Sequence, residues 1–432
     1  MTAVSHEAVR TRAWVLHPDL KQRDAREPGP ALEEAVALAH ALPTLDVRGS
    51  EIVRLPRIHP GTLFGSGKIA ELKDRLKAEE VELVLVDGPV GPVQQRNLEK
   101  EWGVKLLDRT GLILEIFADR ARTSEGVLQV EMAALSYQRT RLVRSWTHLE
   151  RQRGGFGFVG GPGETQIEAD RRAIDDQLLK LKRQLDRVAR TRTLHREARA
   201  KVPFPVVALV GYTNAGKSTL FNRLTGAEVL ARDMLFATLD PTMRRVKLQN
   251  GPEVILSDTV GFISDLPTEL VAAFRATLEE VLDADLILHV RDVSHPESAG
   301  QAKAVEDTLT GLGVSEGAEL IEVWNKIDLL DADARAAIET QGDRVPAVFP
   351  VSALSGDGLP ALIAAVAARV DAPRHEAVLA LGHDEGRARA WLFEQGVVQG
   401  EEGSDAGATL RVLWTDLQAR RFRALRSPAP AS

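Results

Sequence analysis

The stretch GYTNAGKS, from Gly211 to Ser218, combines glycines, a lysine and a hydroxyl at a fixed spacing. An apolar run (VVALV) precedes it and a helix-like run (STLFNRLTG) follows it, which is the strand, loop and helix context of a phosphate-binding loop. Glycines let backbone N–H groups turn inward around phosphates, and the start of the helix adds a positive dipole end. Lys217 can supply a point charge and Ser218 a hydroxyl for Mg²⁺. The nucleotide contacts predicted here are Gly211, Tyr212, Thr213, Asn214, Ala215, Gly216, Lys217, Ser218 and Thr219.

A second stretch, DTVGF, begins at Asp258, the last residue of the apolar run VILSD. Asp258 can hold the water shell of Mg²⁺ there, while the Gly261 amide reaches the γ-phosphate. In many such sites a glutamine after this glycine orients the attacking water, and Phe262 cannot form that hydrogen bond. Phe262 can simply pack in a switch segment, and a partner can complete or reposition the site. We therefore expect slow hydrolysis by the chain alone, with nucleotide contacts from Asp258, Thr259, Val260 and Gly261.

The stretch FATLDPT lies between these two motifs, where a mobile loop must bring a threonine hydroxyl to Mg²⁺ when the γ-phosphate is present. Its position favours Thr238 over Thr242 for this role. Contacts are expected from Phe236, Ala237, Thr238, Leu239 and Asp240. The residues expected to act in hydrolysis itself are Lys217, Thr238 and Gly261.

Two further loops fit a guanine base. NKID follows the apolar run LIEVW, so it lies at a strand end, where the ligand crevice of a parallel sheet is found. The Asp328 carboxylate can accept hydrogen bonds from the ring N–H and the exocyclic amine of guanine, which adenine cannot donate. Lys326 can lie over the base, Asn325 can tie the loop together, and the Ala353 amide can donate to the guanine carbonyl. The order of the motifs favours GTP over ATP, with contacts from Asn325, Lys326, Ile327, Asp328, Val351, Ser352, Ala353 and Leu354.

The elements that must position these loops predict an α/β multidomain fold. Apolar runs alternate with helix-like stretches in a small N-terminal α/β domain (1–120), and a long α-helical hairpin with a glycine-rich tip follows (121–200). A P-loop GTPase domain with a mostly parallel sheet occupies 201–372, after the break KVPFP. The last part, 373–432, reads as a small α/β domain, with strand-like VLALG and ATLRVLWT around a helix-like run and a disordered-looking tail.

The predicted hairpin concentrates arginines near its tip, RGGFGFVGGPGET. A solvated charged face would explain them equally well, but an arginine-lined hairpin that ends in glycines also suits a nucleic-acid probe. Phe156 and Phe158 could stack on unpaired bases. The candidate ribosome contacts are Arg139, Arg141, Arg144, Arg151, Arg153, Phe156 and Phe158.

Composition narrows the class of protein further. The formal net charge of -7 argues against a uniformly basic nucleic-acid coat. The absence of cysteine excludes disulfides, thiolate metal sites and a cysteine nucleophile. No apolar run approaches the roughly 18 residues of a membrane span. We expect a cytoplasmic protein that is a monomer when free.

Most of the chain resembles a known family. GYTNAGKSTLFNRLTG, FATLDPT, DTVGF and NKID, with WTHLERQ and GPGETQIEADRR upstream, are similar to the HflX GTPases of the Obg-related group. The resemblance implies a GTPase that binds the large ribosomal subunit and its rRNA, splits or rescues stalled ribosomes, and extends its hairpin tip toward the peptidyl-transferase region. The family commonly carries an arginine just before GPGE, whereas this chain has Val159, Gly160 and Gly161 there.

A signalling or scaffold module is the competing class. Such a module would use GTP only to change shape for a protein partner, and its hydrolysis would be incidental.

Overall fold

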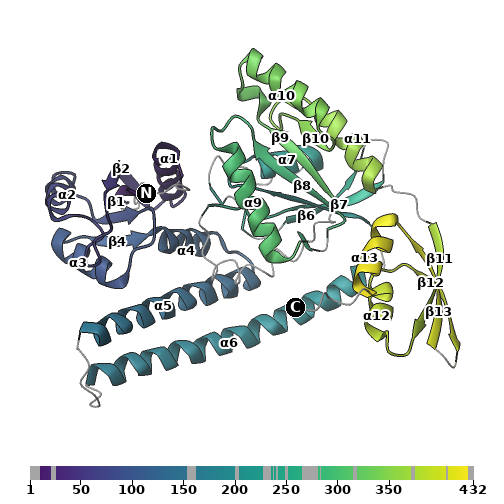
Figure 1. Ribbon diagram of the computed structural model, residues 1–432, viewed down its shortest axis with the longest axis horizontal. Helices are drawn as coiled ribbons and strands as arrows, with labels where there is room; N and C mark the ends of the chain where they lie inside the picture. The colour runs from purple at the N-terminus through teal and green to yellow at the C-terminus, as the bar shows by residue number, and fades with distance from the viewer. Residues whose placement is uncertain are drawn as a thin grey trace, which may run out of the picture.

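The computed structural model describes residues 10–20, 26–152, 162–199, 204–226, 235–236, 238–239, 242–248, 252–264, 281–282, 284–314, 319–370, 375–404 and 407–426. Within the long helices it does not describe the side chains of 143–152, 162–167 and 189–199. The described part is an α/β multidomain structure with three separate sheets, as expected from the sequence (Figure 1). No helix in this part of the chain has both the length and the apolar character needed to cross a bilayer.

The N-terminal domain is built on a parallel sheet with strand order β2-β1-β3-β4. The apolar runs AWVLH, IVRL, LVLVD and VKLLD all lie in or at these strands, because a parallel sheet covered by helices on both faces buries consecutive residues. The elements in order are β1 (Thr11–Leu20), α1 (Pro28–His40), β2 (Leu45–Leu55), α2 (Ser66–Ala78), β3 (Leu83–Val86), α3 (Pro92–Trp102), β4 (Lys105–Asp108) and α4 (Arg109–Arg120).

Two long helices, α5 (Ser124–Gln152) and α6 (Pro162–Arg199), form the predicted hairpin and pack against each other. On α6 Leu181 is buried, and Ile174, Leu178 and Leu185 are half-buried among exposed neighbours. Their spacing of three and four residues forms the apolar stripe that such a helix needs for packing. Figure 1 shows the pair extending beneath the N-terminal domain.

The GTPase domain contains a sheet in the order β10-β9-β8-β5-β7-β6, in which only the β6 and β7 pair is antiparallel. The predicted mostly parallel sheet is therefore confirmed. Its elements are β5 (Val206–Gly211), α7 (Lys217–Thr225), β6 (Thr242–Lys247), β7 (Glu253–Asp258), β8 (Leu286–Asp292), α9 (Ser298–Leu312), β9 (Leu320–Asn325), the 3₁₀ helix η1 (Ile327–Leu329), α10 (Ala332–Arg344), β10 (Val348–Pro350) and α11 (Leu359–Val370).

The C-terminal domain has an antiparallel sheet in the order β11-β13-β12. Its elements are β11 (His375–Gly382), α12 (Gly386–Glu394), β12 (Val398–Ser404), β13 (Gly407–Trp414) and α13 (Asp416–Arg426). β12 and α13 were not predicted from the sequence. β12 reads VQGEEGS and is an exposed edge strand with few apolar residues, so it lacks the usual strand pattern.

One apolar core continues from the N-terminal domain into the GTPase domain. Ile113 and Phe117 of α4 belong to the same buried cluster as Phe236, Val260 and Phe262. The Phe117 and Phe236 rings meet edge to face, with centroids 4.7 Å apart. Figure 1 shows α4 between the N-terminal sheet and the GTPase domain. The segments expected to switch with nucleotide thus pack directly on the N-terminal domain.

Candidate nucleotide site

Lys217 is buried at the first position of α7, in the predicted phosphate loop. Its ammonium group donates to the carbonyl oxygens of Gly211 (3.0 Å) and Tyr212 (2.8 Å). Burial lowers the pKa of Lys217 to about 8, and the charge of Asp258 opposes this shift. The loop therefore contains a desolvated cation that an added phosphate group would stabilise in its charged form.

Ser218, Thr238 and Asp258 come from different elements and meet beside this loop. Asp258 Oδ2 accepts hydrogen bonds from Ser218 Oγ (2.7 Å) and Thr238 Oγ1 (2.9 Å), and the two hydroxyls lie 2.9 Å apart. Burial raises the pKa of Asp258, against the effect of Lys217, and Asp258 Oδ1 has no hydrogen-bond partner among the described residues. Mg²⁺ takes oxygen ligands and keeps several waters, so this donor set fits it. Thr242, the alternative to Thr238, instead begins β6 and pairs with Asp258 in the backbone ladder.

Phe262 is buried, with 2% of its surface exposed. Its N–H donates to Gly211 O (3.1 Å), and its carbonyl accepts from Thr213 N–H (2.7 Å). A Cβ added to Gly261 would lie 2.8 Å from Thr213 Cγ2 and 3.1 Å from Lys217 Nζ. Residues 261–264 form the predicted switch segment. The backbone of Phe262 in this segment is therefore held against the phosphate loop, while the Phe262 ring packs in the core and cannot orient a water molecule.

The loops predicted to bind the base lie together, with one difference from the expected contacts. Asp328 is exposed on η1, and Lys326 has a φ of 70° with its ammonium 2.7 Å from Asp292 Oδ2. The Ala353 N–H donates to Asn325 Oδ1 at 2.9 Å. A guanine carbonyl would have to share that amide with Asn325, which the sequence analysis did not anticipate.

Several other residues that were predicted to contact the nucleotide form hydrogen bonds within the loops or are buried in them. The Thr259 hydroxyl donates to Leu209 O (2.7 Å), and Ser352 Oγ accepts from Ser355 N–H (3.0 Å). Buried in the same loops are Thr213, Ala215, Leu239, Val260, Ile327 and Val351. Asn214 and Leu354 are exposed. Ala237 and Asp240 lie outside the described residues.

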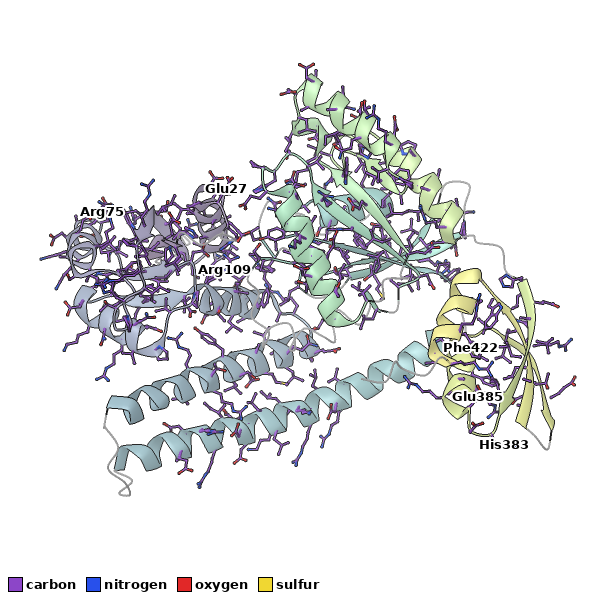
Figure 2. All side chains as sticks on the ribbon, viewed as in Figure 1. Glu27, Arg75, Arg109, His383, Glu385 and Phe422 are labelled. Carbon is purple, nitrogen blue, oxygen red and sulfur yellow. The ribbon has the colours of Figure 1, made fainter. Side chains whose placement is uncertain are left out.

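Contacts between the site and the N-terminal domain were not predicted. The Tyr212 hydroxyl donates to Glu34 Oε2 of α1 and accepts from Ser264 N–H at 2.8 Å. Arg109 of α4 donates to Ser264 O at 2.9 Å, so the domain touches the segment just after Phe262. Figure 2 shows Arg109 at the side of the N-terminal domain that faces the GTPase domain. The sequence signal available for this contact was a tyrosine in a loop of mostly small residues.

The hairpin candidates are only partly described. Arg141 is half-buried and donates to Asp108 Oδ2 (3.1 Å) and to Gln95 Oε1. Arg139 forms an ion pair with Asp175 of α6 at 2.8 Å. Both arginines therefore have partners within the chain. The side chains of Arg144, Arg151, Arg153, Phe156 and Phe158 lie outside the described residues.

The loops at one end of a mostly parallel sheet carry side chains suited to the phosphates and the base of a nucleotide and to a metal ion. This arrangement places the chain among the P-loop GTPases. Residues 206–326 match a family model described as 50S ribosome-binding GTPase. Residues 30–118 and 120–199 match models described as GTP-binding GTPase N-terminal and GTP-binding GTPase Middle Region. The chain belongs to the HflX family of GTPases, which are GTP-hydrolysing enzymes.

Curated relatives match most of the chain. A GTPase HflX of Magnetococcus marinus is 51% identical over 84% of this chain and 83% of its own length. A GTPase HflX of Escherichia coli is 45% identical over 84% of this chain and 85% of its own length. A crystal structure of SsGBP with GDP aligns with 82% of this chain and 97% of that chain, at 25% identity and a TM-score of 0.48.

Proposed function

We propose that this GTPase acts in the cytoplasm on the large ribosomal subunit, and that it splits or rescues stalled ribosomes. The observation that carries the proposal is a long helical hairpin, α5 and α6, whose first helix is bonded near its middle to a domain that contacts the nucleotide switch. The family model of the GTPase domain, described as ribosome-binding, supports the same partner. A long helical hairpin that is connected to a GTP-dependent switch segment suits a large, structured binding partner such as rRNA.

Each residue of the nucleotide site has a separate role in this proposal. Lys217 places its charge on the phosphates, and the Gly261 backbone lies close enough to the phosphate loop to contact the γ-phosphate. Ser218 and Thr238 would hold Mg²⁺ directly and Asp258 would hold it through water. When bound, Mg²⁺ neutralises charge on the β- and γ-phosphates. Asp328 selects guanine through its ring N–H and amine.

The buried Phe262 explains why a partner is needed. A side chain with 2% exposure cannot reach an attacking water, so hydrolysis by the free protein lacks a water-orienting group at this position. Docking on rRNA can supply that group or reposition the switch. We assign the external contacts to Arg144, Arg151, Arg153, Phe156 and Phe158, because Arg139 and Arg141 already hold the hairpin together and to the N-terminal domain.

Gradient sedimentation tests this function. With a non-hydrolysable GTP analogue, the full chain should sediment with large subunits, and with GTP it should convert intact ribosomes into subunits. The Lys217→Ala variant, impaired in phosphate binding, is the control and should do neither. If the chain fails to sediment with ribosomal particles in any nucleotide state, the ribosome role is wrong, and a switch with a protein partner becomes the better hypothesis.

A further inference from the structure

The N-terminal sheet has the reversal of strand order at which open parallel sheets bind ligands. The strand order β2-β1-β3-β4 reverses between β1 and β3, and ligands in such folds lie outside the carboxyl ends of the strands at that point. Asp87 directly follows β3, and Arg109 directly follows β4. The buried Asp87 carboxylate accepts from Arg109 Nη1 at 2.6 Å and lies 2.7 Å from His17 Nδ1. The chain's own charged side chains therefore occupy this end of the sheet.

These charges form a fixed group. Burial by itself would raise the pKa of Asp87, but the hydrogen bond with His17 and the charges of Arg109 and Arg26 lower it to about 2. Burial opposes the charge of Arg109 as well, yet Asp87 and Glu34 raise its pKa. Arg109 has 4% of its side chain exposed, and its planar fork is held between the two carboxylates. A guanidinium held in this way has one defined orientation.

That orientation delivers a hydrogen bond to the switch segment. Besides Glu34, Arg109 Nη2 donates to the backbone carbonyl of Ser264 at 2.9 Å. The Ser264 N–H donates to the Tyr212 hydroxyl in the phosphate loop, which itself bonds Glu34. The charged group at this end of the N-terminal sheet thus binds Ser264, two residues beyond Phe262.

The residue before Arg109 contacts the hairpin. Asp108 is buried and caps α4 by accepting from Gly111 N–H at 2.9 Å. It also accepts from Tyr137 Oη (2.6 Å) and Arg141 Nη1 (3.1 Å) of α5. Adjacent residues at the start of α4 therefore join the middle of α5 to the switch segment.

We propose that Arg109 is a positioning residue for GTP hydrolysis stimulated by the large subunit, through which the helical hairpin sets the conformation of the switch segment. This inference rests on the proposed function, because it makes the hairpin the element that senses the large subunit. A displacement of α5 must move Asp108, and Arg109 lies on the same helical turn and moves with it. The contact from Arg109 to Ser264 then changes, and Gly261 and Phe262 lie only three and two residues before Ser264 in the chain.

The Arg109→Lys variant tests this role, because lysine keeps the buried charge but cannot hold two carboxylates and a carbonyl in a fork. Arg26→Lys is the matched control: Arg26 also pairs with Glu34 and Asp87, and its substitution leaves the Arg109 contact to Ser264 in place. For Arg109→Lys we expect basal GTP turnover and large-subunit affinity within about threefold of the unmodified chain, and stimulation by large subunits reduced at least about fivefold. The control should keep its stimulation.

Full stimulation of Arg109→Lys would overturn the inference, and so would a parallel loss of stimulation in Arg26→Lys. Loss of large-subunit binding in Arg109→Lys would show that Arg109 only shapes the docking surface. If the unmodified chain is itself not stimulated, the proposed function fails instead, so the two failures can be told apart.

A second variant approaches the same path from the hairpin and removes a single hydroxyl. Tyr137→Phe deletes the hydrogen bond to Asp108 and keeps the ring, so it also serves if Arg109→Lys does not fold. It should lower stimulation without loss of large-subunit binding, and combining it with Arg109→Lys should lower stimulation little further, because residues in one network are not additive. Unchanged stimulation in Tyr137→Phe, or independent losses that multiply in the double variant, would contradict a shared path.

Discussion

Asn325 shows how one side chain can assemble separate nucleotide loops. Its amide donates to Ala215 O (2.8 Å) in the phosphate loop, and its oxygen accepts from Ala353 N–H (2.9 Å). A Cβ on Gly216, whose φ is 91°, would lie 2.2 Å from the Asn325 amide nitrogen, so this position requires glycine. One side chain therefore joins the phosphate loop to the predicted base loop.

At the same scale, Asp328 is expected to determine the choice of base. The Asp328→Asn substitution replaces a double acceptor with an amide that can donate, so selectivity should move from GTP toward xanthosine triphosphate, whose ring offers the reciprocal groups. Competition binding measures the change. Asp333→Asn, an exposed acid on the adjacent α10, is the control and should bind as the unmodified chain does. A full preference for GTP in Asp328→Asn would show that another residue reads the base.

The pKa of Lys217 predicts a pH dependence of binding. Burial lowers this pKa to about 8 in the nucleotide-free chain, and bound phosphates favour the charged amine, so binding above pH 8 requires uptake of a proton. The association constant for GTP should therefore fall about tenfold between pH 7 and pH 9. Titrations across this range should show the fall in the unmodified chain and not in Lys217→Ala, which also reports any ionisation of the nucleotide itself. A flat profile in both proteins would mean that Lys217 stays charged in the empty site.

Among the elements, α4 has the most consequences for function. It contributes Ile113 and Phe117 to the core shared with the GTPase domain, and its first residue, Arg109, reaches the switch segment. From the sequence, residues 109–120 were only part of the predicted N-terminal α/β domain, with no helix named there, and this role was not visible. The motifs of the nucleotide site are short and have characteristic spacing, so they were readable. The contact from Arg109 to Ser264 joins residues 155 positions apart, and no periodicity or motif links such residues.

The edge-to-face pair of Phe117 and Phe236 predicts a stability effect. Phe117 is 1% exposed, so Phe117→Ala should lower the free energy of unfolding by about 3–5 kcal/mol through lost burial and a cavity. Denaturant titration of the domains that share this core measures the loss. Phe393→Ala on α12 is the control, because Phe393 is 47% exposed and should cost much less. Equal losses for the two variants would contradict the shared core.

The hairpin tip predicts a separation of binding from basal chemistry. Deletion of Gly154 to Gly163, with the hairpin closed by a short turn, should leave intrinsic hydrolysis within about twofold, because the deleted residues are remote in sequence from every nucleotide loop. Stimulation by large subunits should largely disappear, and any remaining affinity should depend less steeply on salt as phosphate contacts are lost. Replacing only Phe156 and Phe158 by alanine should weaken binding by roughly 1 to 3 kcal/mol per stacked base, with the salt slope unchanged. Normal stimulation after the deletion would reduce the hairpin to a spacer.

At the scale of the whole molecule, the GTPase domain and the N-terminal domain contact each other at several points. Besides the shared core, the Glu27 N–H at the start of α1 lies 3.2 Å from Glu297 Oε1 beside α9. Figure 2 shows Glu27 on the same side of the N-terminal domain as Arg109. The hairpin in turn is held to the N-terminal domain at Asp108. A ribosome that engages the hairpin would therefore act on a connected path to the nucleotide site.

Single-turnover and steady-state GTP hydrolysis by the full chain, with and without purified large ribosomal subunits, tests the central claim most directly. With Phe262 buried and no glutamine in its place, the free protein should turn over at about 10⁻⁴ to 10⁻² per second, the range of unassisted GTPases. Large subunits should raise the rate at least about tenfold, whereas small subunits should not, and the Lys217→Ala variant corrects for contaminating hydrolysis. Fast turnover by the free chain, or a rate that large subunits leave unchanged, would contradict the account and require a water-orienting residue elsewhere in the chain.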